Sequence, residues 1–357
     1  MRDKSPITPR SPRAALEPEQ VPPPPKRSDR ARNPFVVVGN AIITILIVVM
    51  IAAGGGYFYG KQKLEAAGPL REDKIVNIPS RAGMGDISDI LIREGVIENN
   101  RWAFIGSVLA LKARSDLKPG EYAFQKSASL RDVIATIVEG KVVQHSVTIP
   151  EGLTSEQIVA RLSENDIFAG SVREMPREGT LLPETYKFPR GTTREQVLQR
   201  MQQTQKRVLA EIWERRNADI PVKSPEQLIV LASIVEKETG VGADRGKVAG
   251  VFVNRLRLGM PLQTDPTVIY GLGAAFDGNL RKRDLQADTP YNTYLRPGLP
   301  PTPIAIPGRA SLLAAVRPEP TKALYFVARG DGSSEFSETL AEHNRAVNRY
   351  QRRASAP

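Results

Sequence analysis

The chain has 357 residues, a length that suits two or three domains rather than one. Hydrophobic residues make up 41% and charged residues 25%, so most of the chain can bury a core and global disorder is excluded. There is no cysteine, which excludes thiol nucleophiles and iron–sulfur clusters. There are only two histidines, too few to provide the ligands of a multi-histidine metal site. We therefore expect neither a metal nor a cofactor. The formal net charge of +11 predicts attraction to polyanions, such as nucleic acid, acidic lipid or an anionic cell-wall polymer.

The first 33 residues are basic and rich in proline. They carry eight Lys or Arg against four Asp or Glu and include the run Pro22–Pro25. Prolines exclude a regular helix there, and too few apolar residues remain to build a core. We expect residues 1–33 to be a disordered arm.

An uncharged segment follows and predicts a transmembrane helix over residues 34–60. Residues 35–53 are apolar for about the length that crosses a hydrocarbon core, and Tyr57 to Tyr59 follow where an aromatic belt is expected. A cleaved signal peptide is the alternative, but the apolar run is too long and no small-residue cleavage site follows it.

The basic arm also predicts an orientation. Basic residues before the span favour a cytoplasmic N-terminus, so in a bacterial cell the rest of the chain would be periplasmic, attached to the inner membrane by a single pass. The lack of cysteine fits that compartment. Nucleic acid is then excluded as a partner of the exported part.

Residues 76–168 contain a repeated pattern. In both copies an Ile-Pro pair is followed by isoleucine, leucine and a closing apolar residue at the same distances: Ile78-Pro79 with Ile87, Leu91 and Val96, and Ile149-Pro150 with Ile158, Leu162 and Ile167. This spacing predicts a strand, a turn and an amphipathic helix, the second helix capped by Thr154 with Gln157. Such units resemble LysM, a carbohydrate-binding fold, although an ordinary α/β packing unit without a ligand fits equally well.

Several further elements are predicted between residue 130 and the C-terminus. We expect helices over 130–138, 193–217, 224–239, 246–258 and 338–352, and a hairpin of strands 324–328 and 334–336. Residues 262–271, 291–294 and 298–308 are dense in turn formers and polar side chains. They suit a groove that binds sugars, and equally well plain loops.

The predicted helix over 224–239 is the best candidate for chemistry. Residues 228–235 are apolar on nearly all sides, which predicts a buried helix, and Glu236, Lys237 and Glu238 follow at its end. Desolvation there would raise the pKa of a glutamate and keep it protonated as a general acid. A solvated helix end is the alternative, and the spacing does not decide between Glu236 and Glu238.

The chain resembles the endolytic murein transglycosylases, the MltG/YceG-like family, over about residues 34–350. Order and spacing agree in several motifs, and only the long Pro- and Arg-rich arm departs from the pattern. The matching segments are Gly179-Thr-Leu-Leu-Pro-Glu-Thr-Tyr186, Leu231-Ala-Ser-Ile-Val-Glu-Lys-Glu-Thr239, Val251-Phe-Val-Asn-Arg-Leu256, Leu262-Gln-Thr-Asp-Pro-Thr-Val-Ile-Tyr-Gly271, Tyr291-Asn-Thr-Tyr294 with Gly298-Leu-Pro-Pro301, and His343-Asn344.

The resemblance implies an α+β protein with a single N-terminal transmembrane helix. A LysM-like α/β subdomain would occupy residues 61–170 and a mixed α+β catalytic domain with a mostly helical centre residues 171–350, before a disordered tail over 351–357. The implied activity is cleavage of the MurNAc–GlcNAc bond within peptidoglycan glycan strands, which leaves a 1,6-anhydro-MurNAc end and terminates nascent strands. The implied partners are those strands and cell-wall synthases. A non-catalytic peptidoglycan-binding scaffold and a hydrolytic muramidase remain the alternatives.

The resemblance also assigns residues. Glu236 is implied to be the catalytic acid and base. The predicted substrate-binding residues are Glu184, Tyr186, Gln263, Asp265, Tyr291 and Asn292. For Glu184 the alternative is a structural or substrate-orienting role. For Asp265, which precedes Pro266, the alternative is that it only caps a turn.

Overall fold

The structure, a computed structural model, describes residues 33–352. The predicted arm, apart from Asn33, and most of the predicted tail lie outside the described residues. The chain divides into two compact units, one reaching to Ala67 and including Ser129–Arg131, the other comprising Gly68–Ala128 and the chain from Asp132 onward. The elements are helices and two-stranded antiparallel sheets, so the α+β class is confirmed.

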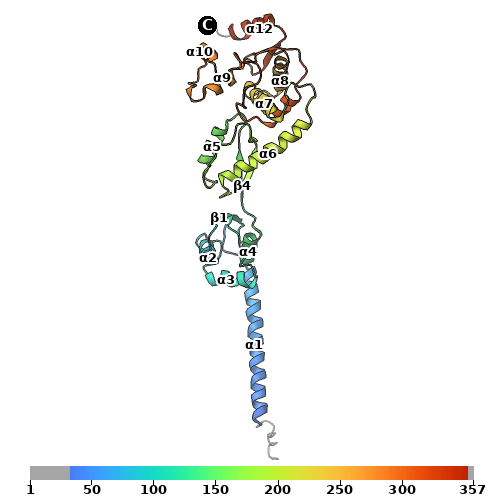
Figure 1. The fold of residues 1–357 in the computed structure, drawn as a ribbon. Helices are drawn as coiled ribbons and strands as arrows, with labels where there is room; N and C mark the ends of the chain where they lie inside the picture. The colour runs from blue at the N-terminus through green and yellow to red at the C-terminus, as the bar shows by residue number, and fades with distance from the viewer. Residues whose placement is uncertain (1–32, 353–357) are drawn as a thin grey trace, which may run out of the picture. The chain divides into compact units, whose positions relative to one another are not determined.

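The first unit is dominated by one long helix, α1, over Pro34–Glu65 (Figure 1). Asn33 caps it, since its side chain accepts a hydrogen bond from Phe35 N, and Pro34 occupies the first turn, where its missing N–H is not needed. No residue of α1 is buried, and its apolar part reaches a mean hydropathy of 2.8. By length and composition α1 is a candidate membrane span.

The second unit begins with the first copy of the repeat. Its elements are β1 (Lys74–Ile78), α2 (Met84–Arg93), α3 (Arg101–Ala110), β2 (Gly120–Phe124) and α4 (Leu130–Glu139). The strands β1 and β2 pair antiparallel. The predicted apolar positions Ile87, Leu91 and Val96 are all buried, so the strand–turn–helix prediction is confirmed here.

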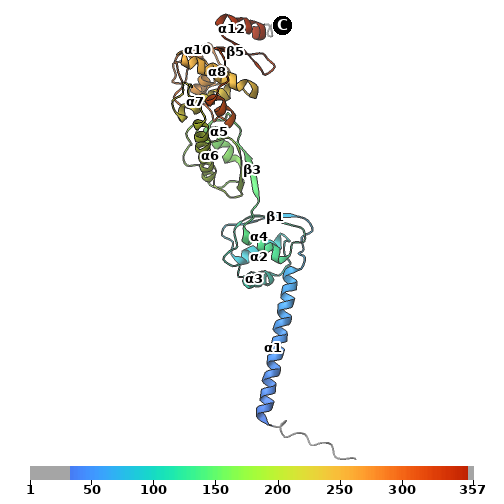
Figure 2. The same ribbon diagram turned by 90° about the vertical axis from the view of Figure 1, so that its right-hand side faces the viewer.

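The second copy of the repeat contributes to a larger core. Its elements are β3 (Gln144–Thr148), α5 (Ser155–Glu164), β4 (Thr185–Pro189) and α6 (Arg194–Glu214). Thr154 and Gln157 form the predicted capping box at α5. The strands β3 and β4 pair antiparallel, and apolar residues of α5 and α6 join one cluster. Helices α5 and α6 lie close together in Figure 2. This pairing crosses residue 170, where the sequence predicts a domain boundary.

Helix α7 (Pro225–Glu238) lies at the centre of the largest apolar cluster. Every residue from Leu228 to Val235 is buried, which confirms the predicted burial on all sides. Its neighbours are α8 (Gly242–Arg257) and α11 (Arg309–Val316), and Figure 1 shows α7 next to α8. Because Ser224 caps the first turn and the polar run starts at Glu236, only the two ends of α7 approach solvent.

Three predicted element boundaries are wrong. Helix α8 begins at Gly242 rather than at residue 246, because the glycines there are tolerated in a first turn that Asp244 stabilises with its negative charge. Part of the loop expected over 262–271 is helix α9 (Asp265–Leu272), with Pro266 in its first turn. The last helix, α12 (Leu340–Val347), begins after the capping residue Thr339 and passes into a π-helical turn over Asn348–Arg352.

The remaining elements are short. After α9 come a 3₁₀ turn, Gly273–Ala275, and α10 (Lys282–Leu285). The predicted hairpin is confirmed as β5 (Tyr325–Ala328) and β6 (Ser334–Ser337). Its second strand is fixed near the start of α8, since Asp244 accepts a hydrogen bond from Ser334 N at 2.6 Å.

Candidate active site

Glu236 lies at the point where buried helix α7 reaches the surface, and it is half-buried. Its carboxylate oxygen Oε2 accepts a hydrogen bond of 2.9 Å from Gly308 N, the N-cap of α11. A helix N-terminus presents unpaired N–H groups and a partial positive charge, so it favours a carboxylate. The other oxygen, Oε1, has no hydrogen-bond partner among residues 33–352.

Glu151 brings a second carboxyl group to Gly308. A Cβ atom added to Gly308 would overlap with the carboxyl group of Glu151, so this carboxyl group fills the space of a side chain. Gly308 has a φ of −73°, which any residue adopts, so its backbone conformation does not require glycine. Glycine is needed there because of the space that Glu151 occupies.

Backbone pairing holds Glu151 in place. Gly152 N donates to Ile306 O at 2.9 Å, and Ile306 N donates to Leu153 O at 2.7 Å, so the segment after Glu151 pairs with the segment before Gly308. Gly152 also contacts Glu236, since a Cβ atom there would lie 3.7 Å from Glu236 Cγ. Both carboxyl groups therefore approach the same residue, Gly308.

The surroundings of Glu151 both raise and lower the pKa of its carboxyl group. Burial of its carboxyl group raises the pKa of Glu151, although the residue as a whole is exposed, and the negative charge of Glu236 raises it further. The guanidinium of Arg245 lowers the pKa of Glu151. Arg245 Nε is itself buried and without a hydrogen-bond partner in the part of the chain that the structure describes.

Glu238, two residues after Glu236, has different partners. Its carboxyl group accepts a hydrogen bond from Thr264, the residue before α9. Burial raises the pKa of Glu238, the hydrogen bond from Thr264 lowers it, and the charges of Asp265 and Arg255 raise and lower it respectively. The desolvated glutamate that the sequence predicts at this helix end is therefore Glu238.

The raised pKa of Glu238 predicts a pH-dependent stability. Since the pKa is raised in the folded protein, the stabilising contribution is fully present below the ordinary value of 4.5 and is lost as pH rises through the folded pKa. As the pH rises from below 4.5 through the folded pKa of Glu238, we expect the melting temperature of Glu238→Gln to fall less than that of the wild type. Thermal melts of the full chain in detergent measure it. Glu156→Gln, at an exposed position on α5, should follow the wild type, and parallel curves for wild type and Glu238→Gln would contradict the prediction.

Two of the predicted groove residues are exposed next to Glu238. Gln263 has a positive φ of 50°, and its side-chain oxygen accepts from buried Arg255 at 3.3 Å. Asp265 accepts a hydrogen bond of 2.5 Å from Tyr294 OH. Burial and this bond to Asp265 raise the pKa of Tyr294, so the tyrosine stays a donor. Asp265 is the first residue of α9, so its backbone begins a helix.

Two other predicted groove residues lie in the interior. Tyr186 is 5% exposed, and its OH donates to Leu182 O at 2.8 Å; burial raises its pKa to about 12. Asn292 is fully buried, and its amide donates to the carbonyls of Leu285 and Ala287. Both side chains use their polar groups to fix loops and present none of them at the surface.

Glu184 and Tyr291 lie on other segments. Glu184 is exposed one residue before β4. Tyr291 is half-buried, and its ring meets that of Tyr270 edge to face at 5.0 Å, while its OH pairs with Thr302 at 2.8 Å. Among residues 33–352, neither residue forms a hydrogen bond with Glu236.

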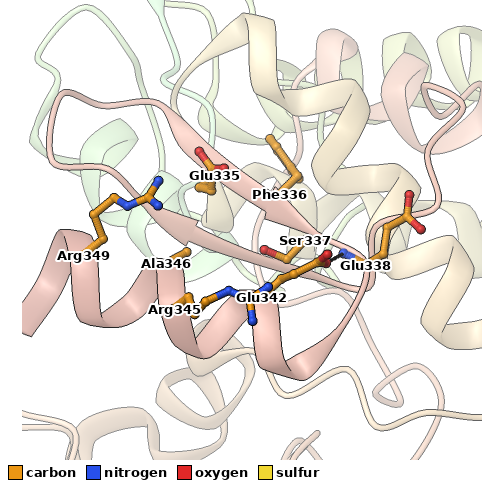
Figure 3. Close-up of a pocket in the computed structure, with 8 residues that line it drawn as sticks. All are labelled: Glu335, Phe336, Ser337, Glu338, Glu342, Arg345, Ala346 and Arg349. Carbon is orange, nitrogen blue, oxygen red and sulfur yellow. Dashed lines mark hydrogen bonds between the residues drawn. The ribbon is translucent and has the colours of Figure 1, made fainter.

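A separate cavity of about 410 Å³ lies between β6 and α12 (Figure 3). Its lining is mostly charged and includes Glu335, Glu342, Arg345 and Arg349, but neither Glu236 nor Glu238. Among residues 33–352, no group of three or more Asp, Glu or His side chains is placed to hold a metal ion.

Glu151, Gly308 and Arg245 were not predicted from the sequence. One signal for Glu151 does exist in the repeat. The two copies align at Ile78-Pro79 and Ile149-Pro150, and the residue after the proline is Ser80 in the first copy and Glu151 in the second. A carboxylate at this position in only one of the two copies indicates a role that the shared fold does not require.

Comparison with known proteins identifies the family. The profile of the YceG-like family matches residues 76–349, which is most of the chain. The chain belongs to the YceG-like family. The match includes Glu151, Glu236 and Gly308.

Curated relatives carry one name. A protein of Bacillus subtilis (strain 168) named endolytic murein transglycosylase is 34% identical over 330 residues, which cover 82% of this chain and 89% of the relative. A protein of Streptococcus pneumoniae serotype 2 (strain D39 / NCTC 7466) with the same name is 26% identical over 321 residues, which cover 76% of this chain and 57% of the relative. Among solved structures, a YceG-like protein from Listeria monocytogenes is 33% identical, with a TM-score of 0.47, and the match covers 77% of this chain and 99% of that one.

Proposed function

We propose that this protein is a membrane-anchored lytic transglycosylase that cuts the MurNAc–GlcNAc bond within peptidoglycan glycan strands. Family membership supports the substrate class. The observation that carries the chemistry is the position of Glu236, half-buried at the end of a buried helix, with one oxygen held by Gly308 N and the other free of partners among residues 33–352. Such a carboxyl group is oriented and still able to exchange a proton.

Glu236 would act first as an acid and then as a base. Its proton passes to the glycosidic oxygen as the bond to the muramoyl anomeric carbon breaks and an oxocarbenium-like state develops. The muramoyl primary hydroxyl then attacks that carbon, and Glu236 takes up the hydroxyl proton while the 1,6-anhydro ring closes. No water is consumed, so no second carboxylate has to activate one, in contrast to ordinary two-carboxylate hydrolysis.

Glu151 would support both steps by its charge. A carboxylate beside the developing oxocarbenium stabilises the positive charge, which is the kind of electrostatic contribution that lowers barriers most. The negative charge of Glu236 raises the pKa of Glu151, because two neighbouring carboxylates repel each other. The guanidinium of Arg245 opposes this effect, since it lowers the pKa of Glu151.

The architecture suggests how the enzyme is held at its substrate. We propose that α1 crosses the inner membrane once, with the arm in the cytoplasm and the second unit in the periplasm. Residues 61–142 would form the LysM-like module, and the chain from β3 onward would form the catalytic part, because β3 pairs with β4. Gln263 and Asp265 are proposed to contact the glycan, whereas Tyr186 and Asn292 maintain the fold. Glu184 and Tyr291 are proposed to contact the glycan away from Glu236. Cell-wall synthases are the proposed protein partners.

Product analysis tests this function. The full chain in detergent is incubated with uncrosslinked glycan strands, and both new chain ends are identified by mass spectrometry. We expect internal fragments whose MurNAc ends are lighter by one water than reducing ends. Reducing ends would instead identify a hydrolytic muramidase, and intact strands that remain bound would identify a scaffold.

A further inference from the structure

Helix α3 exposes an apolar face that no element within residues 33–352 covers. Its inner face is fully buried through Phe104 and Val108. Its outer residues are apolar as well: Trp102 is 78% exposed and Leu109 is 50% exposed. Ala103, Gly106 and Ala110 complete the same exposed face. A helix of a soluble domain normally carries charged residues on its solvent side, so this face is expected to be in contact with something apolar.

The ends of α3 are basic. No charged residue occurs between Arg101 and Lys112, and Arg114 follows shortly after. All three basic residues are exposed, and Arg101 also pairs with Asp89 at 3.2 Å. An apolar face with tryptophan and leucine, bordered by Lys and Arg, is typical of helices that lie in the surface of a bilayer with anionic headgroups.

The chain keeps α3 near the candidate span. Helix α1 ends at Glu65, and the strand that begins the second unit starts at Lys74. The residues between them reach roughly 30 Å at most when fully extended. A module on such a short tether has a high local concentration at the membrane surface, so even a small apolar face contributes effectively to binding.

We propose that the outer face of α3, with Trp102 and Leu109, docks on the surface of the bilayer that α1 spans. The proposal rests on the proposed membrane anchoring. Tryptophan favours the interface because its ring is apolar and its indole N–H remains in water. Docking would restrict the LysM-like module to the membrane surface, so its glycan partner would be held close to the site of strand synthesis.

Fluorescence of Trp102 tests the proposal in the intact protein. The sequence contains two tryptophans, so Trp213→Phe leaves Trp102 as the only one. The full chain is reconstituted into vesicles of phosphatidylcholine and phosphatidylglycerol that carry a nitroxide either at the headgroup or at the acyl end. We expect strong quenching of Trp102 by the headgroup nitroxide, weaker quenching by the acyl-end nitroxide, and protection from aqueous acrylamide.

Two variants in the Trp213→Phe background make the test specific. Leu109→Glu places a charge on the face and should reduce headgroup quenching several-fold without affecting the core, since Leu109 is exposed. Leu340→Glu, at a similarly exposed leucine on α12, should leave the quenching of Trp102 unchanged. Equal quenching in Leu109→Glu and the parent would overturn docking through this face.

Flotation with the vesicles separates this proposal from the anchoring itself. If the chain floats and resists extraction by alkaline carbonate while Trp102 stays open to acrylamide, anchoring stands and the docking of α3 is overturned. If the chain does not float, both are overturned. Protection of Trp102 from acrylamide in detergent micelles at high protein concentration, without quenching by labelled lipid, would indicate a second copy of this chain as the occupant and would also overturn the proposal.

Discussion

Replacing Glu236 by glutamine should reduce strand cleavage by on the order of 10²-fold to 10⁴-fold while leaving the fold intact. Glutamine removes the exchangeable carboxyl proton, yet its amide oxygen still accepts the hydrogen bond from Gly308 N. A role limited to capping α11 would therefore survive the substitution, and a role in proton transfer would not. The measurement is the rate at which anhydro ends appear from purified glycan strands.

Three control measurements show whether a loss of cleavage in Glu236→Gln is specific to proton transfer. Glu226→Gln, an exposed position in the first turn of the same helix, should cleave like the wild type. Thermal melts should show that Glu236→Gln keeps the wild-type melting temperature within a few degrees, and a glycan pull-down should show that it still binds. If Glu238→Gln loses cleavage and Glu236→Gln keeps it, the proton transfer belongs to Glu238 and its partner Thr264 instead.

Local signals explain why much of the fold was predictable. Helix α5 begins where Thr154 and Gln157 require it to, and α7 begins at Ser224 with Pro225, because caps act within one turn of the chain. Apolar periodicity likewise marks the buried faces of α2 and α7. Predictions of element boundaries failed at glycine and proline, because these residues occur both in turns and in the first turn of a helix. Gly242 and Pro266 suggest turns, but both lie in the first turn of a helix.

The site was less predictable because its geometry is set by contacts that the sequence does not encode locally. Glu236 follows from the end of an apolar helix together with the family resemblance. Its relation to Glu151 depends on the pairing of Gly152 with Ile306, residues far apart in the chain. Tyr186 and Asn292 show the opposite error, since polar and aromatic residues that suit a sugar groove can equally satisfy buried backbone groups.

Glu151→Gln should slow cleavage by about tenfold or more, a loss of about 1.4 kcal/mol in transition-state stabilisation for each factor of ten. Glutamine fills the same space beside Gly308 but carries no charge, so packing is kept and the electrostatic contribution is removed. Glu156→Gln, exposed on α5, is the matched control. An unchanged rate would mean that Glu151 is an ordinary surface residue.

Gly308→Ala tests the same idea without altering either carboxyl group. The φ of Gly308 suits alanine, so the backbone should not be strained, but the new methyl group must displace the Glu151 carboxyl group that occupies its place. That carboxyl group is the far end of a flexible side chain, so stability should change little. We expect cleavage to fall to about the level of Glu151→Gln, and the double variant to be no slower than either single one, because both remove the same interaction. Rates measured across pH for the four proteins complete this cycle. Independent, multiplicative losses would show that Gly308 acts through its hydrogen bond to Glu236 rather than through the space it leaves for Glu151.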